Sequence, residues 1–329
     1  MGSLSSGVFL LDLALLGGFP EGRITTVVGQ KGTGKTTLYH KAVANFQRKY
    51  NGVNRPKRKA AWIDVEQAYD PLWAIKNGVD VDDLTLIQPP DGDAAGDIFN
   101  AVLENDDYGI VILDSLANLV GEKETEKSVS DQTMAPVATI AQRMLRISST
   151  IIAKAIAKGD VKTALIINQY REKPTMMGDP RNLPGGKFVR FYSSVELEIY
   201  NKEIIEADEH GLGSVHHNDH SFKIMKNRIG NSIREAEFTM NRRTTDRLAE
   251  AAIDDFATTV TYGQKFGMVT GAGQKWQLVH PYTGEVIDTK SKTAIVELIE
   301  KTPELYRDIQ RKVISLQRKK NGLSEDGWW

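Results

Sequence analysis

One eight-residue segment constrains the fold of this chain more than any other part of the sequence. It reads GQKGTGKT over residues 29–36 and fits the pattern G-x-x-x-x-G-K-[ST]. A β-branched run over residues 24–28 precedes it, and a segment of helical character follows it. In this context the pattern predicts a P-loop, in which a glycine-rich turn between a strand and a helix surrounds phosphate groups. The alternative is an ordinary glycine-rich turn, which the correct flanks make a poorer explanation.

The residue types in this segment indicate how a nucleoside triphosphate would be held. Glycines let the turn direct several backbone N–H groups inward, and the following helix adds its positive end. Lys35 would reach the β- and γ-phosphates, and the Thr36 hydroxyl would hold Mg²⁺. The predicted phosphate-binding residues are Gly29, Gln30, Lys31, Gly32, Thr33, Gly34, Lys35, Thr36 and Thr37.

Four short apolar runs recur in the first half of the chain, at residues 24–28, 60–65, 110–113 and 164–167. The segments between them are long enough for crossover helices, so the spacing predicts βαβ units and a parallel sheet. In such sheets ligands bind beyond the carboxyl ends of the strands. The residues that close each run are therefore candidates for the site.

All four runs end in polar residues. The second is followed by Glu66, which would orient or deprotonate the water that attacks the γ-phosphate, unless it is a solvated acid at a strand end. The third closes on Asp114 in the form of a Walker B strand, whose carboxylate binds the magnesium shell; the alternative is a capping Asp. The fourth closes on Asn168 and Gln169, where an amide would sense the γ-phosphate or simply form a turn.

A large ring beside an acid follows Glu66. Trp73 would stack on adenine, and Asp70 would accept a hydrogen bond from its exocyclic amine. The alternative is an ordinary core or surface tryptophan.

Two polar stretches predict loops that would contact nucleic acid. Residues 121–133 lack helical or strand periodicity, and the glycines and prolines of residues 170–187 exclude regular structure. Cations and methionines in the second loop would bind phosphates and wedge between bases. On the helix between the loops, Arg143 and Arg146 are either phosphate contacts or part of a solvated face. The candidates in the second loop are Arg171, Lys173, Thr175, Met176, Arg181, Gly185 and Gly186.

A basic pair, Lys226 and Arg228, follows the alternating segment 221–225. If that strand lies at a subunit boundary, the pair would insert into a neighbour's nucleotide site, as arginine fingers do; otherwise it is a surface strand end. Histidines at 216, 217 and 220 fit no closed metal site, and we expect them at a hairpin tip.

The composition excludes several classes of protein. With 329 residues the chain is long enough for a large α/β domain plus a smaller lobe. It has no cysteine, which excludes disulfides, thiolate metal sites and a thiol nucleophile. It also lacks a membrane-length apolar run and a secretory N-terminal pattern, so we expect a cytoplasmic protein without a membrane partner. Because the formal net charge is −1, any nucleic-acid surface must come from local basic clusters.

The last part of the chain has a different composition. Residues 275–279 and 285–287 flank a turn sequence and predict a hairpin. Thr302 and Pro303 predict the start of a helix. Its inward-facing residues would be Leu305, Ile309, Val313 and Leu316.

These features together resemble the RecA recombinase family, from about Leu4 to about Ile314. Several motifs in the right order carry the resemblance. They are LLDLAL at 10–15, GGFPEGR at 17–23, the P-loop, IDVEQAYDP at 63–71, LDS at 113–115, INQ at 167–169, GG at 185–186, FYSSV at 191–195 and MKNRI at 225–229.

The resemblance implies an ATP-dependent helical filament on single-stranded DNA that pairs it with homologous duplex DNA and exchanges strands. It implies a RecA-like P-loop ATPase core of parallel-rich sheet flanked by helices over residues 1–243, and a small α+β domain over 244–329. The implied cofactors are ATP and Mg²⁺, with Thr36 and Asp114 as magnesium partners and Trp73 and Asp70 as adenine contacts.

The resemblance also assigns roles beyond the nucleotide. Phe191 resembles an intersubunit switch residue, Met134 a first-loop residue that props bases apart, and Arg146 a DNA backbone contact. The implied catalytic set is Glu66, Lys35, Gln169 as γ-phosphate sensor, and Lys226 and Arg228 acting in trans.

Some features depart from the bacterial pattern. The family's N-terminal helix and linker are missing, so we expect weaker self-association. The charged insert at 121–133 and the Pro174-Thr175 pair look more like a bacteriophage homologue. Two other functions stay open: a ring-forming motor of the same fold, such as a helicase, and a nucleotide-switched recombination mediator. The C-terminal lobe and the 226–228 block argue against the motor.

Overall fold

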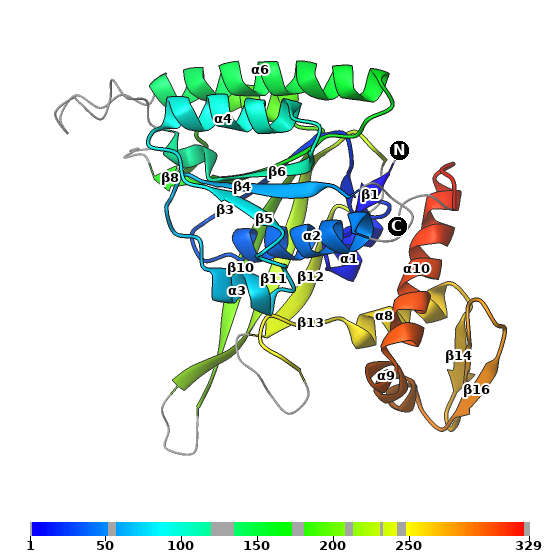
Figure 1. Ribbon diagram of the computed structural model, residues 1–329. Coiled ribbons are helices and arrows are strands. Elements are labelled where there is room, and N and C mark those ends of the chain that lie inside the picture. Colours follow the sequence, from blue (N-terminus) through cyan, green and yellow to red (C-terminus); the bar gives the residue numbers. More distant parts are fainter. Residues whose placement is uncertain are drawn as a thin grey trace.

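The computed structural model describes residues 2–51, 57–119, 135–172, 181–207, 213–230, 233–241 and 248–325. A large central sheet with helices on both faces forms the main body, and a smaller lobe lies beside it (Figure 1). Within the described residues, no helix is both long and apolar enough to cross a bilayer.

Within the ranges just given, the central sheet has nine strands, of which six adjacent ones run parallel. In spatial order they are β13 (Ile253–Asp254), β12 (Glu235–Asn241), β11 (Gly213–Asn227), β10 (Val195–Ala207), β3 (Ile24–Gly29), β7 (Thr163–Gln169), β6 (Tyr108–Asp114), β4 (Lys59–Asp64) and β5 (Leu84–Ile87). The parallel part extends from β10 to β5, and β11, β12 and β13 pair antiparallel beyond it. The predicted parallel-rich α/β fold is confirmed, and its four predicted strands are β3, β4, β6 and β7.

The parallel strands are buried on both faces because alternate side chains belong to different cores. Trp62 of β4 packs in one cluster with Tyr39 of the preceding helix, whereas its neighbour Ile63 packs in the other cluster with Phe99 and Met144. Figure 1 shows α4 and α6 over one face and α2 and α3 over the other. These helices are α2 (Lys35–Tyr50), α3 (Pro71–Lys76), α4 (Gly92–Glu104) and α6 (Ala135–Ala157). Burial on both faces explains why the strands read as continuous apolar runs.

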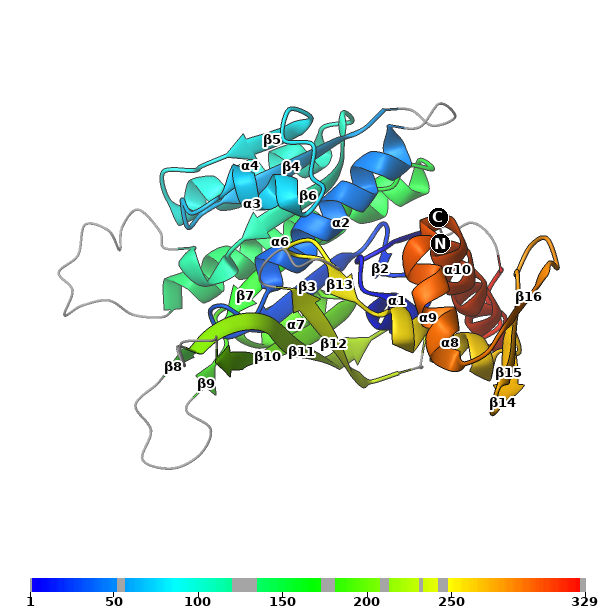
Figure 2. The same ribbon diagram turned by 90° about the horizontal axis from the view of Figure 1, so that it is seen from below.

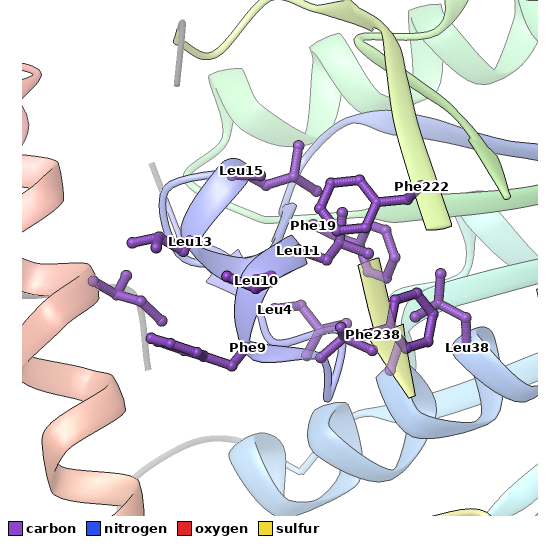
Figure 3. Close-up of a cluster of buried hydrophobic side chains, with 14 of the residues drawn as sticks. Leu4, Phe9, Leu10, Leu11, Leu13, Leu15, Phe19, Leu38, Phe222 and Phe238 are labelled. Carbon is purple, nitrogen blue, oxygen red and sulfur yellow. The ribbon is translucent and has the colours of Figure 1, made fainter. Parts of the chain in front are cut away.

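The N-terminal segment completes the core. It forms β1 (Ser3–Leu4), the wholly buried helix α1 (Phe9–Ala14) and β2 (Phe19–Pro20). Its apolar side chains pack against Phe222 and Phe238 of the antiparallel strands and Leu38 of α2 (Figure 3). The one acid of α1, Asp12, accepts hydrogen bonds from the hydroxyls of Ser5 and Ser6.

The smaller lobe combines a three-stranded antiparallel sheet with three helices (Figure 2). Its elements are α8 (Phe256–Lys265), β14 (Val269–Ala272), β15 (Lys275–Val279), β16 (Val286–Thr289), α9 (Lys292–Lys301) and α10 (Pro303–Lys320). The predicted hairpin is confirmed, since Leu278 pairs with Ile287. Three of the four predicted inward residues of α10 are buried, but Leu316 is only half-buried, and Ile314 is buried in addition. The predicted domain boundary at 243 lies outside the described residues and stays a prediction.

Two local predictions are wrong. Residues 170–187 do contain regular structure, because β8 (Arg171–Glu172) pairs with β9 (Arg181–Asn182) and α7 (Gly186–Tyr192) begins inside that range. Pairing the two flanks satisfies their backbone groups, and Gly185, with φ of 76°, provides the left-handed residue before α7. The histidines at 216, 217 and 220 lie within β11 rather than at a tip, since pairing with β10 continues to Gly213. The first predicted loop, 121–133, lies outside the described residues.

Candidate nucleotide site and its connections to the predicted DNA-binding loops

The predicted site residues converge because four parallel strands end at the same edge of the sheet. The spatial order β3, β7, β6, β4 places the P-loop, Gln169, Asp114 and Glu66 side by side at the carboxyl ends. The register aligns Gly29 with Gln169 and Asp64 with Asp114. This edge is where parallel sheets bind ligands.

The turn between β3 and α2 has the conformation of a phosphate cradle. Gly32 and Gly34 have φ of 79° and 86°, values that residues with a side chain rarely adopt. Gly32 has open space where a Cβ would be, whereas at Gly34 a Cβ would come within 3.0 Å of Nε2 of His220. The backbone of this turn therefore stays accessible to a bound phosphate.

Lys35 is buried beneath the turn. Its Nζ donates to the backbone oxygen of Gln30 and lies 3.5 Å from Oγ1 of Thr33. Burial lowers its pKa to about 8, while the negative charges of Asp114 and Glu66 favour the ammonium form. The negative charge of a bound phosphate would also favour the ammonium form of Lys35, so the site fits a polyanion.

Thr36 and Asp114 provide oxygen ligands suited to Mg²⁺. The Thr36 hydroxyl donates to Oδ2 of Asp114 at 3.1 Å. Burial, and then the charge of Glu66, raise the pKa of Asp114 to about 7. A divalent cation would offset both effects. In the part of the chain that the structure describes, no three His, Cys, Asp or Glu side chains gather around one point, so the ion would take its other ligands from phosphates and water, as Mg²⁺ commonly does.

Glu66 lies at the centre of a short hydrogen-bonded chain. Its Oε1 accepts from the hydroxyl of Ser115 at 2.6 Å and from Nε2 of Gln169. Ser115 precedes the segment that leads to the first predicted loop, and Gln169 precedes β8 at the base of the second. One carboxylate therefore contacts the start of both segments.

A cleft of about 480 Å³ extends from the P-loop along the site. Its wall includes three residues that sequence reasoning missed: His220 of β11, Met240 of β12, and Glu250. No local motif marks them, because His220 and Met240 reach the cleft through the pairing of distant strands and Glu250 through contacts of the segment between β12 and β13. The lining residues are Lys31, Gly32, Gly34, Lys35, Thr36, Thr37, Glu66, Trp73, Gln169, His220, Met240 and Glu250.

The two predicted adenine contacts have different positions. Trp73 lines the cleft, and its indole Nε1 donates to Oγ1 of Thr37 at 3.0 Å. Asp70 does not line it; its Oδ1 caps α3 by accepting from the backbone N–H groups of Leu72 and Trp73 at 2.9 and 3.1 Å. Asp70 therefore has a structural role at a helix start.

The predicted trans-acting cations lie at the opposite end of the sheet from their own P-loop. The backbone of Arg228 bonds to Ser194, which bonds to Ile24 at the beginning of β3. The P-loop begins at the end of β3, five residues or about 17 Å farther on at 3.3 Å per residue. Lys226 Nζ donates to the backbone oxygens of Arg190 and Phe191 at the end of α7. The Phe191 side chain is 64% exposed.

The predicted DNA contacts are placed unevenly. Arg143 and Arg146 are exposed on α6, and Arg143 forms a loose ion pair with Asp97 at 3.5 Å. Arg171 donates to the backbone oxygen of Ala117 and to Oδ1 of Asn118. These hydrogen bonds join the segment before the first predicted loop to the start of the second. Gly185 and Gly186 both have positive φ at the start of α7. Outside what the structure describes are Met134, Lys173, Thr175, Met176 and the side chain of Arg181.

The fold and the cleft together define a P-loop protein: the phosphate-binding turn ends one strand, and acidic and amide side chains end its parallel neighbours. Comparison with known proteins narrows this class. The sequence model of the RecA N-terminal domain matches residues 1–243. The chain belongs to the RecA family.

Curated relatives extend the similarity over most of the chain. The RecA protein of Halalkalibacterium halodurans is 36% identical over 269 residues, which cover 80% of this chain and 72% of the relative. That of Mycoplasma mobile is 31% identical over 319 residues, covering 96% and 88%. That of Staphylococcus carnosus is 33% identical over 313 residues, covering 94% and 80%. All three organisms are bacteria, so the expected likeness to a bacteriophage homologue stays a prediction.

Proposed function

We propose that this chain is an ATP-dependent DNA recombinase, which binds single-stranded DNA, pairs it with homologous duplex DNA and exchanges strands in recombination and repair. Membership of the RecA family and the RecA proteins among its relatives support this function. The observation that carries it is the chain of contacts from Glu66 to Ser115 and Gln169. It connects the nucleotide cleft to the chain segments from which both predicted DNA-binding loops begin.

Hydrolysis is attack by water on the γ-phosphate. Both hydrogen bonds to Glu66 use Oε1, which leaves Oε2 to orient and deprotonate the water. Lys35 and the backbone of the turn stabilise the charge that develops on the phosphate oxygens. Thr36 and Asp114 would hold Mg²⁺, which would neutralise more of that charge. Because Gln169 shares Oε1 of Glu66, a change at the γ-phosphate alters its hydrogen bonding and moves the start of the second loop.

Lys226 and Arg228 complete the site of a neighbouring subunit. Their place at the far end of the sheet prevents contact with their own nucleotide, so a head-to-tail filament would bring them to the next one. ATP then lies between subunits and favours the assembled state, and hydrolysis weakens it.

A mixing experiment tests this arrangement. Glu66→Gln binds ATP without hydrolysing it and keeps its cations, whereas Lys226→Ala combined with Arg228→Ala keeps Glu66. Each variant alone is inactive, but in an equal mixture about one junction in four pairs an intact Glu66 with intact cations. We expect the mixture to regain roughly that share of the wild-type ATPase rate. A mixture as inactive as its components contradicts action in trans.

A second assay separates the recombinase from its alternatives. We expect the ATPase rate to rise with single-stranded DNA and electron micrographs to show helical filaments. Closed rings that translocate along DNA indicate a helicase-like motor. Slow hydrolysis without DNA stimulation or filaments indicates a nucleotide-switched mediator.

A further inference from the structure

A groove of about 870 Å³ lies where the smaller lobe meets the main body, and we call it the lobe groove. The last turns of α2 form one wall, α10 forms the other, and the N-terminal segment lies between them (Figure 1). The lobe groove shares no lining residue with the nucleotide cleft, and its volume is in the range of small-molecule pockets. The lining residues are Ser3, Leu4, Ser5, Asp12, Asn45, Arg48, Lys49, Glu304, Arg307, Asp308, Gln310, Arg311 and Ile314.

The two walls of the lobe groove are held in fixed positions. Nη1 of Arg318 on α10 donates to the backbone oxygen of Leu16 at 2.5 Å. Asp255, just before α8, accepts from the backbone N–H of Phe9 at 3.1 Å and from the hydroxyl of Tyr306 on α10. The lobe is therefore bonded to the N-terminal segment, and the groove is formed before any ligand enters. A preformed pocket lowers the cost of binding.

Two cations of like charge stand on the two walls. Arg48 belongs to α2 and Arg307 to α10, and both line the lobe groove. Burial, and then the positive charge of Arg307, lower the pKa of Arg48. Within the described residues, no carboxylate forms an ion pair with either guanidinium. The two charges repel each other, and an anion between them would replace this repulsion with two attractions.

The guanidinium of Arg48 is oriented before a ligand binds. Its Nη2 donates to Oδ1 of Asn45 at 2.6 Å, and Nδ2 of Asn45 donates to the backbone oxygen of Ser5 at 3.0 Å. This contact uses one of the five N–H donors of the guanidinium. The others form no hydrogen bond within the part of the chain that the structure describes. They suit a phosphate group, whose oxygens match the fork of a guanidinium.

The acids on the α10 wall restrict the class of anion. Glu304 and Asp308 line the groove on either side of Arg307 along the helix. Asp308 makes only loose contacts, 3.8 Å to Nη1 of Arg311 and 3.7 Å to Nε2 of His280. A long run of phosphates, such as a DNA backbone, would meet these acids and be repelled. A single phosphate group avoids them, and hydroxyl groups on the same ligand can donate to their carboxylates.

We propose that the lobe groove binds a small phosphate ester, with its phosphate between Arg48 and Arg307 and its hydroxyl groups on Glu304 and Asp308. This site is separate from the nucleotide cleft and does not depend on its contents. Because one guanidinium belongs to the main body and the other to the lobe, the bound ester stabilises the docked position of the lobe.

Glycerol 3-phosphate is a suitable probe, since it carries one phosphate group and two hydroxyl groups. We would measure its equilibrium affinity for the full chain by calorimetry at low ionic strength. We expect saturable binding and a rise in Tm with the concentration of the probe. Arg48→Gln and Arg307→Gln should each weaken binding by about 10- to 100-fold, the value of a hydrogen bond to a charged group. Glycerol, which lacks the phosphate, should not bind.

Two matched variants control for other phosphate sites and for loss of charge. Lys35→Ala disables the phosphate-binding turn, so probe that binds in the nucleotide cleft would be lost with it. Lys301→Gln removes an exposed cation of the lobe that does not line the groove. Both variants should retain the wild-type affinity for glycerol 3-phosphate.

The stability of the ligand-free protein separates a binding role from a structural one. Because no carboxylate among the described residues pairs with Arg307, Arg307→Gln should have a Tm equal to or higher than that of the wild type. A clearly lower Tm in ligand-free Arg307→Gln would make Arg307 a structural residue and overturn the proposal.

Four binding results would also overturn the proposal. They are a wild-type chain that does not bind glycerol 3-phosphate at millimolar concentration, unchanged affinity in Arg307→Gln, affinity lost in Lys35→Ala, and equal binding of glycerol. A fluorescent duplex oligonucleotide, added without nucleotide, tests the other source of phosphate. If Arg307→Gln weakens its binding and glycerol 3-phosphate displaces it, the groove binds a DNA backbone and the proposed ligand class is wrong.

Discussion

Asp114→Asn should stabilise the nucleotide-free protein while abolishing Mg²⁺-dependent hydrolysis. Asp114 is only 8% exposed, and burial followed by the charge of Glu66 raises its pKa from 3.8 to about 7. The folded protein therefore holds a proton that the unfolded chain releases, and between these two pKa values stability falls as pH rises. Asparagine has nearly the same shape and can still bond Thr36, but it carries no charge.

The size of the effect follows from the two pKa values. The difference between a pKa of 3.8 and one of about 7 corresponds to a loss of about 4 kcal/mol in the free energy of unfolding when Asp114 is ionised, at 1.36 kcal/mol per pKa unit. The gain from the substitution should grow from about 2 kcal/mol at pH 5 to about 4 kcal/mol at pH 8, where it levels off. Because Glu66 shares the repulsion, these figures are upper limits. For a domain of this size they correspond to a rise in Tm on the order of 10 °C at pH 8.

Thermal unfolding of the nucleotide-free wild type and Asp114→Asn between pH 5 and pH 8 tests this reasoning. Asp83→Asn is a control of opposite sign. Although partial burial opposes it, hydrogen bonds from Asn51 and Lys57 lower the pKa of Asp83, so its loss should destabilise the protein at neutral pH. An Asp114→Asn variant that is no more stable than wild type at pH 8, or whose gain in stability is the same at pH 5 as at pH 8, would show that Asp114 does not have the raised pKa. Saturating Mg²⁺ and ADP should stabilise the wild type more than Asp114→Asn and so reduce the difference in Tm between the two proteins.

Three further predictions follow from the contacts of the site and core. Glu66→Gln should bind ATP with nearly wild-type affinity but lower the single-turnover hydrolysis rate by about 10²- to 10⁴-fold, and an unchanged rate would remove Glu66 from the mechanism. Trp62→Ala should lower the free energy of unfolding by about 3–5 kcal/mol in denaturant titrations, because Trp62 is fully buried; a loss below 1 kcal/mol would mean that the core does not pack as described. Arg171→Ala should weaken ATP-dependent binding of single-stranded DNA without changing its salt dependence, because Arg171 joins the two loop bases; a salt slope lower by about 1 would instead make it a phosphate contact.

Local patterns in the sequence determined much of the nucleotide site. The P-loop is one contiguous motif, and a glycine-rich turn between a strand and a helix forms from local backbone preferences alone. Asp114 and Gln169 were predictable because each directly follows an apolar run that can only be a buried strand. The hairpin around Pro281 and the helix that begins at Pro303 were predictable for the same reason, since turn and capping residues act on their immediate neighbours.

The tertiary structure alone decided which distant residues meet. Glu66 contacts Gln169 because β4 and β7 flank β6, and strand order results from packing of the whole sheet rather than from any one strand. Because β11 runs antiparallel to β10, Lys226 and Arg228 lie at the end of the sheet away from their own nucleotide cleft, whereas His220 lines that cleft. Glu250 reaches the cleft through long-range hydrogen bonds from Lys41 and Asn241. Residue order along the chain specifies local geometry, but these contacts form only when buried surfaces far apart in the sequence come together, and no short pattern encodes that.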